Sequence, residues 1–308
     1  MRKTDDSSLK PSEYKKIRQY ARRVLEDTGA WGQRPTNVAA VMEAAKVTEV
    51  PDDVLGDAGF LARMKRKAGL AGKALKAAIS KVRGLFDAKD GFVFIDRSMK
   101  LVKQTFVRLH EAGHAYLPWQ RPMYSVVQDC DQTLDPEIAD LFDREANVFA
   151  AEVLFQLDSF ANEAEQREFS ILTPVGLSKK YGASIYASVR QYVSKNQRTC
   201  VVLVLNPPVL VSGVGFQSTL RRVVPSPSFA ERFSDIRWPE SYTPDDRIGA
   251  FIPIHGRRAS WPRELPLIDA NGDTHECIAE AFTQGTQVFI LIHVKHALTK
   301  KISLGLTI

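Results

Sequence analysis

The chain has 308 residues, with 42 Lys and Arg against 36 Asp and Glu, and 44% of its residues are hydrophobic. This length and apolar content suffice for two ordinary domains or one large one, and they exclude disordered and collagen-like chains. There is no apolar run of about 18 residues and no apolar stretch near Met1, so we expect neither a membrane-spanning helix nor a secretory signal.

The N-terminal part reads as helices followed by a hairpin. Apolar residues at helical spacing predict one helix over 12–27, with Ser12 as its N-cap, and a second near 38–45. Residues 60–83 contain eight basic residues and no acid, which favours a solvated pair of basic helices over a face for nucleic acid or acidic peptides. Residues 84–96 have the pattern of a β-hairpin.

The rest of the chain changes from helical to β-rich patterns. We predict helices over 98–117, which must end before Pro118, and over 136–155, and a pair of short helices around Gly182 within 172–195. Short β-rich runs cover 199–206, 209–214 and 287–295, and Asp269–Asp273 is typical of a hairpin turn. The sequence therefore predicts an α+β fold: a mostly helical domain with a small sheet over 1–170, a helix-turn-helix-like segment over 171–198, and a β-rich α+β domain over 199–308.

The residues His110-Glu111-Ala112-Gly113-His114 form the most informative motif. On a helix the two imidazoles are one turn apart and about 40° apart in direction, so both can bind one metal ion. Glu111 lies close enough to reach a water molecule on that ion. Gly113 has no side chain and allows a neighbouring element to approach the helix. Two neutral imidazoles with an open position favour zinc.

A catalytic zinc ion normally has a third protein ligand, and the helix predicted over 136–155 carries the candidates. Its apolar residues define a buried arc, and Asp143 falls inside that arc on a helical wheel. Because a buried carboxylate needs a cation, Asp143 is the predicted third ligand. The other acidic candidates, Asp140, Glu145 and Glu152, fall outside the arc, and Glu145 remains the alternative.

These motifs together resemble the ImmA/IrrE family of zinc-dependent metallo-endopeptidases. The resemblance is carried by Phe94-Ile95-Asp96, by Phe106–His114 and by Asp143–Ala151, which is similar to the family's E-x-x-A-N-x-F-A-A run, and it extends over about residues 12–195. It implies a zincin-like peptidase domain at the N-terminus. It also implies that the third ligand is the first residue of that run, where this chain has Asp143 in place of glutamate.

The family resemblance implies cleavage of a helix-turn-helix repressor protein, with Zn²⁺ held by His110, His114 and Asp143 and with Glu111 as general base. Residues 120–170 contain three basic and twelve acidic residues, which favours basic substrates. Three cysteines without a CxxC pair indicate separate buried thiols and a reducing, cytoplasmic location.

The alternative function is a DNA-binding or effector-sensing regulator with a structural metal site. DNA contact is the less favoured interpretation, because the second helix of the 172–195 pair carries one arginine only. The role of the C-terminal domain and the oligomeric state are left open. In length and position this domain is similar to the sensor-like domain of IrrE-like proteins.

Overall fold

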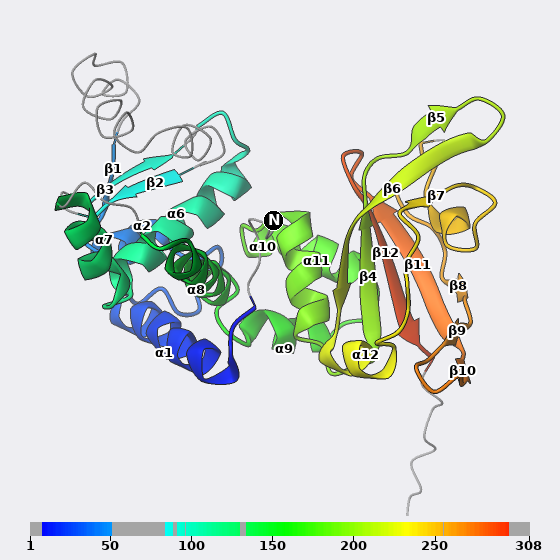
Figure 1. The fold of residues 1–308 in the computed structure, drawn as a ribbon, viewed down its shortest axis with the longest axis horizontal. Helices are drawn as coiled ribbons and strands as arrows, with labels where there is room; N and C mark the ends of the chain where they lie inside the picture. Colours follow the sequence, from blue (N-terminus) through cyan, green and yellow to red (C-terminus); the bar gives the residue numbers. More distant parts are fainter. Residues whose placement is uncertain are drawn as a thin grey trace, which may run out of the picture. The chain divides into compact units, whose positions relative to one another are not determined.

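A computed structural model describes residues 8–50, 84–88, 91–95, 97–129, 134–254 and 256–295 (Figure 1). The chain divides into two compact units, Met1–Asn162 with Leu177–Ser184 and Glu163–Gly176 with Ile185–Ile308. The predicted α+β class is confirmed, with helices dominant in the first unit and strands in the second. The basic segment 60–83 lies outside the described residues, and domain boundaries near 170 and 198 stay a prediction.

The first unit is built mainly of helices. Those described are α1 (Pro11–Asp27), α2 (Val38–Ala44), α6 (Leu101–Tyr116), α7 (Gln120–Asp129) and α8 (Pro136–Leu154), and α9 (Ser159–Glu165) follows. The predicted N-cap at Ser12 is wrong, because α1 begins one residue earlier, after Lys10. Pro11 occupies the first helical position, which suits its fixed φ and missing N–H, and Glu13 accepts a hydrogen bond from the Lys10 amide at 2.9 Å.

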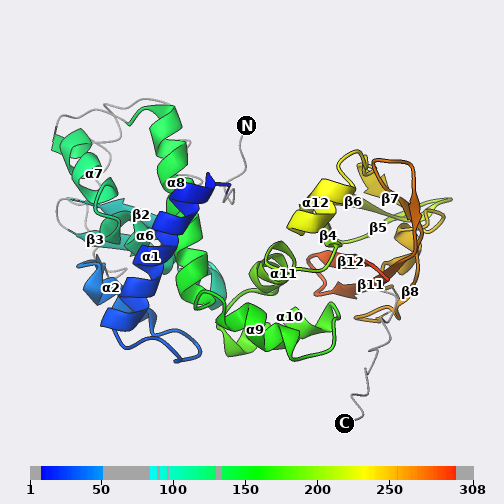
Figure 2. The ribbon, with the colours of Figure 1, turned by 90° about the horizontal axis from the view of Figure 1, so that it is seen from below.

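Helix α8 lies at the centre of this unit, with α6 and α1 packed against it (Figure 2). Gly113 of α6 makes the first contact close: a Cβ there would lie 3.1 Å from Phe149 Cδ1 and 3.4 Å from Ala146 Cα, both on α8. The expected role of Gly113 is therefore confirmed. On the side facing α1, the buried Glu152 accepts a hydrogen bond from the Tyr14 hydroxyl.

A small sheet precedes α6 and has the strand order β1-β3-β2. Strands β2 (Gly84–Asp87) and β3 (Phe92–Ile95) pair antiparallel, so the predicted hairpin is confirmed. Strand β1 (Thr48–Glu49) adds to β3 in parallel, with Thr48 opposite Phe92. This sheet brings Glu49 to α6.

The second unit contains a seven-stranded sheet with the order β5-β6-β4-β12-β11-β8, in which β7 also pairs with β6. The strands are β4 (Cys200–Leu205), β5 (Val209–Val211), β6 (Gly215–Pro225), β7 (Ser241–Tyr242), β8 (Arg263–Glu264), β11 (Cys277–Thr283) and β12 (Val288–Val294). All of these pairings are antiparallel. The predicted hairpin at Asp269–Asp273 is confirmed as β9 (Leu267–Ile268) paired with β10 (Thr274–His275).

Both faces of this sheet are covered at β4, because all six of its residues are buried. Val201 and Leu203 point into a core that includes Phe229 of α12 (Pro227–Arg232), and the residues between them point to the opposite face. Helix α11 (Ile185–Ser194) packs on β4 and β6, and α10 (Leu172–Lys180) precedes it around Gly182, as predicted.

Two of the cysteines, Cys200 and Cys277, are confirmed as buried free thiols, whereas Cys130 lies outside the described residues. Among the helices of the described ranges, none has the length and apolar composition needed to cross a membrane.

Candidate metal centre

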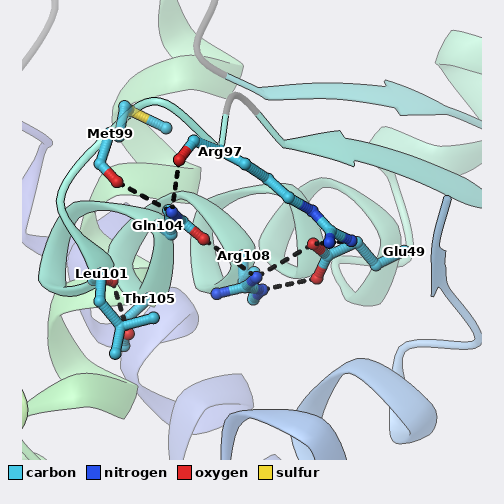
Figure 3. Close-up of polar contacts among 7 residues, drawn as sticks. All are labelled: Glu49, Arg97, Met99, Leu101, Gln104, Thr105 and Arg108. Atoms are coloured by element: carbon cyan, nitrogen blue, oxygen red, sulfur yellow. Dashed lines mark hydrogen bonds and ion pairs between the residues drawn. The ribbon is translucent and has the colours of Figure 1, made fainter. Parts of the chain in front are cut away.

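Helix α6 is fixed at its N-terminal half by a network of polar contacts (Figure 3). Arg108 bonds Glu49 of β1 through Nε at 2.6 Å and through Nη2 at 3.0 Å, and Arg97 approaches the same carboxylate at 3.3 Å. Gln104 donates to the carbonyls of Arg97 and Met99, which ties the preceding loop to the helix. The network holds the helix that carries the histidine motif against the small sheet.

The side chains of His110 and His114 converge one turn apart near the end of α6. Their Nε2 atoms are 3.1 Å apart, and the rings meet edge to face. Asp143 reaches this pair from α8, with Oδ1 at 3.6 Å from Nε2 of His114 and 4.0 Å from Nε2 of His110. The structure therefore brings together the three residues that the sequence predicts as metal ligands.

The spacing of these three atoms fits a zinc ion. Ligand bonds of about 2.0–2.2 Å in a tetrahedral arrangement place neighbouring ligand atoms about 3.3 Å apart. The observed separations of 3.1, 3.6 and 4.0 Å are close to that value. Two imidazole nitrogens and one carboxylate oxygen are also a donor set that zinc accepts, with one position left for water or substrate.

Asp143 lies beside the histidines because α8 packs against α6, and not because its own side chain is buried. Its side chain is 65% exposed, so the sequence argument that placed it inside a buried arc is wrong on that point. Glu145 and Glu152, expected outside the arc, are buried instead. The reason is that α1 and the Trp119–Gln120 segment cover this side of α8, whereas the helical wheel assumes one covered face.

Glu145 is directed away from the histidine pair by two donors. Trp119 Nε1 bonds its Oε2 at 2.7 Å, and Gln120 Nε2 bonds the same oxygen at 2.6 Å. Of the two candidates for a third ligand, only Asp143 therefore lies close to both histidines, whereas Glu145 accepts hydrogen bonds from Trp119 and Gln120.

Gln120 connects this buried carboxylate to His114. Its Nε2 faces two acceptors, Glu145 Oε2 and the Phe142 carbonyl, so its Oε1 must face Nδ1 of His114, at 2.7 Å. An amide oxygen accepts only, so His114 carries its proton on Nδ1 and presents a free lone pair on Nε2. Such a second partner fixes the tautomer and direction of a metal-binding histidine.

The surroundings shift the pKa values of the two histidines in opposite directions. Burial, followed by the charge of His114, lowers the pKa of His110 to about 3, which keeps it neutral. Burial also opposes protonation of His114, but the Asp143 carboxylate and the charge of Glu111 raise its pKa overall. Burial raises the pKa of Glu111 to about 7, a range suited to a group that takes up and releases protons.

Tyr124 of α7 lies beside this cluster. Its ring stands edge-on to His114, with centroids 5.3 Å apart, and it also contacts Phe142. Burial, together with the charges of Asp143 and Glu111, raises its pKa above the usual range, so the hydroxyl keeps its proton. No sequence pattern points to Tyr124 or Gln120, because polar residues after a helix-ending proline are typical of a loop.

Comparison with known proteins was consistent with this geometry. Residues 73–189 match the peptidase M78 family, described as the IrrE N-terminal-like domain. A solved structure described as a Mycobacterium tuberculosis transcriptional regulator is similar, with a TM-score of 0.51 and 14% identity, over 91% of this chain and 76% of that one. At that identity the likeness shows the fold alone. No curated protein matches the chain significantly.

Proposed function

We propose that this chain is a zinc-dependent endopeptidase of the ImmA/IrrE type that acts on a specific regulatory protein, a proposal supported by the match of residues 73–189 to the peptidase M78 family. The observation that carries the proposal is the convergence of His110 Nε2, His114 Nε2 and Asp143 Oδ1 beside the buried Glu111. A zinc ion held by these three groups would polarise a peptide carbonyl and lower the pKa of a water molecule.

The protein's own residues would then perform the proton transfers. Glu111 accepts a proton from the attacking water and delivers it to the nitrogen of the leaving amine, so it returns to its starting state. Gln120 holds His114 in the tautomer that leaves Nε2 free. Each role depends on a group that the fold already holds in place.

Tyr124 is the donor we assign to the carbonyl oxygen on which charge develops. It lies against His114 and retains its proton, and the hydroxyl adds a hydrogen bond where negative charge forms. Tyr124→Phe removes only this oxygen and keeps the ring against His114. We expect a loss of kcat of about a hundredfold with unchanged zinc content. An unchanged kcat would show that the donor is elsewhere.

We infer that the substrate is a helix-turn-helix repressor and that its basic surface matches the acidic residues of 120–170. A purified helix-turn-helix repressor protein is the probe. Wild type should cleave it in the presence of zinc, and Glu111→Gln should bind zinc but leave it intact. Glu43→Gln, at an exposed position of α2 outside that acidic stretch, is the matched control and should cleave normally.

The alternative, a regulator with a structural metal site, predicts a different result. Zinc would be bound stoichiometrically, yet wild type and Glu111→Gln would leave the regulator equally intact. Loss of cleavage restricted to Glu111→Gln supports the peptidase and contradicts this alternative.

A further inference from the structure

A cleft of about 770 Å³ opens at one end of the large sheet in the second unit. It is lined by the segment after β4, the start of β6, the loop after residue 252 and the turn between β11 and β12. Its volume lies within the range of about 300–1,000 Å³ that small-molecule sites occupy. The cleft involves no residue of the metal centre, so it lies outside the proposed peptidase function.

The walls are apolar and largely rigid. Apolar side chains dominate them, among them Pro207, Pro208, Leu210, Phe216, Ile254 and Phe282. Leu210 is 89% exposed, which leaves its apolar surface available to a ligand. Prolines fix φ, so the walls lose little conformational freedom when a ligand binds.

Gly215 brings two of these walls together. Its φ of +93° belongs to the region that favours glycine, and a Cβ there would lie 3.3 Å from Pro244 Cγ. A larger residue would strain the backbone where β6 begins. The cleft is therefore shaped by the backbone, in addition to its side chains.

The polar contribution to the cleft is cationic. Arg257 and Arg258 are exposed at its edge, and its described lining residues include no acid. Within the part of the chain that the structure describes, neither guanidinium forms an ion pair with a carboxylate. Guanidinium groups bind carboxylates and phosphates through paired hydrogen bonds.

We propose that this cleft binds a small amphipathic anion, with its apolar body against Leu210 and Phe216 and its carboxylate or phosphate on Arg257 and Arg258. The cleft lies at the end of the sheet, where loops and turns form most of its lining, and its volume suits a compact small molecule.

The test is calorimetric titration of the full-length protein with decanoate, decyl phosphate and decanol. We expect saturable binding of at least one of the two anions, and the tighter anion identifies the head group. Decanol, which has the same chain and no charge, should bind about tenfold more weakly or not at all. The double variant Arg257→Ala/Arg258→Ala should weaken anion binding by about tenfold or more.

Two further variants distinguish binding in the cleft from nonspecific binding elsewhere on the protein. Arg237→Ala, another exposed arginine of this unit that lies outside the cleft, should bind as wild type does. Leu210→Ser changes an exposed residue and should fold normally, but it should weaken both anions. The proposal is overturned if decanol binds as tightly as the anions, if the double variant is unaffected, if neither anion binds saturably, or if only an acidic apolar peptide binds.

Discussion

Gln120→Leu gives the sharpest test of how the metal centre is positioned. The substitution keeps the side-chain size but removes the amide that accepts from His114 Nδ1 at 2.7 Å and donates to Glu145 at 2.6 Å. Because Gln120 is completely buried, no water can take its place. The His114 ring then loses both its fixed tautomer and its fixed direction.

The expected magnitude follows from these contacts. Loss of the hydrogen-bond partner of a metal-binding histidine typically lowers metal affinity by about 10–100-fold, or about 1.4–2.7 kcal/mol. The complete burial of Gln120 favours the upper half of that range. Glu145 also loses one of its two donors, which should lower the free energy of unfolding of the metal-free protein by about 1–3 kcal/mol.

The assay is a competition titration of zinc against a chromophoric chelator, combined with urea unfolding of the metal-free protein. Gln104→Leu is the matched control, because Gln104 lies on α6, as His114 does, but its hydrogen bonds are to Arg97, Met99 and Arg108 and not to a histidine. It should lose stability but keep its zinc affinity within about twofold. Wild-type affinity in Gln120→Leu, or an equal loss in Gln104→Leu, would refute the positioning role of Gln120.

Three more predictions follow from the same geometry. Asp143→Asn should lower zinc affinity by at least tenfold in the chelator titration, whereas Asp143→Glu should retain it. A larger loss of zinc affinity in Glu145→Gln than in Asp143→Asn would make Glu145 the third ligand instead. Gly113→Ala should lower the free energy of unfolding in urea by about 1 kcal/mol, because overpacking against α8 exceeds the gain in helix propensity. Gly176→Ala, at an exposed position of α10 where a Cβ would meet only Arg167 Nη1 at 4.0 Å, should raise the free energy of unfolding. A rise in both variants would contradict the close helix contact at Gly113. Glu49→Gln should lower the free energy of unfolding by about 1 kcal/mol at neutral pH. Because Arg108 lowers the pKa of Glu49, this difference from wild type should be complete above the unfolded pKa of about 4.3 and should vanish as the pH falls through the lower folded pKa. Urea unfolding at several pH values measures the difference, and a difference that persists in acid would disprove the linkage.

The sequence predicts those parts of the fold that depend on local patterns. The periodicity of 12–27 and of 136–155 gives α1 and α8, and the turn at Asp269–Asp273 gives its hairpin. Strands β6 and β11 were missed. Strand β11 has the sequence Cys-Ile-Ala-Glu-Ala-Phe-Thr, whose alanines and glutamate are poor strand formers, and its buried Glu280 is satisfied by the Ile171 amide, far away in the sequence.

The candidate site, like the fold, is predictable from the sequence only where it depends on a local pattern. His110, Glu111 and His114 are found from the sequence because one helical turn places them together. Asp143 does lie beside the histidines, but burial is not the reason, since its side chain is exposed and reaches them because α8 packs against α6. Gln120 belongs to a chain of contacts between three segments, which becomes visible only when α8 is placed beside α6.

Zinc content, measured by elemental analysis on purified protein equilibrated with zinc, tests the central claim most directly. Wild type and Glu111→Gln should each hold one zinc ion per chain, and His114→Ala should hold far less, because it loses one of the two imidazole ligands. A wild-type protein that binds no zinc, or a His114→Ala variant that retains the full amount, would contradict the metal centre described for this chain.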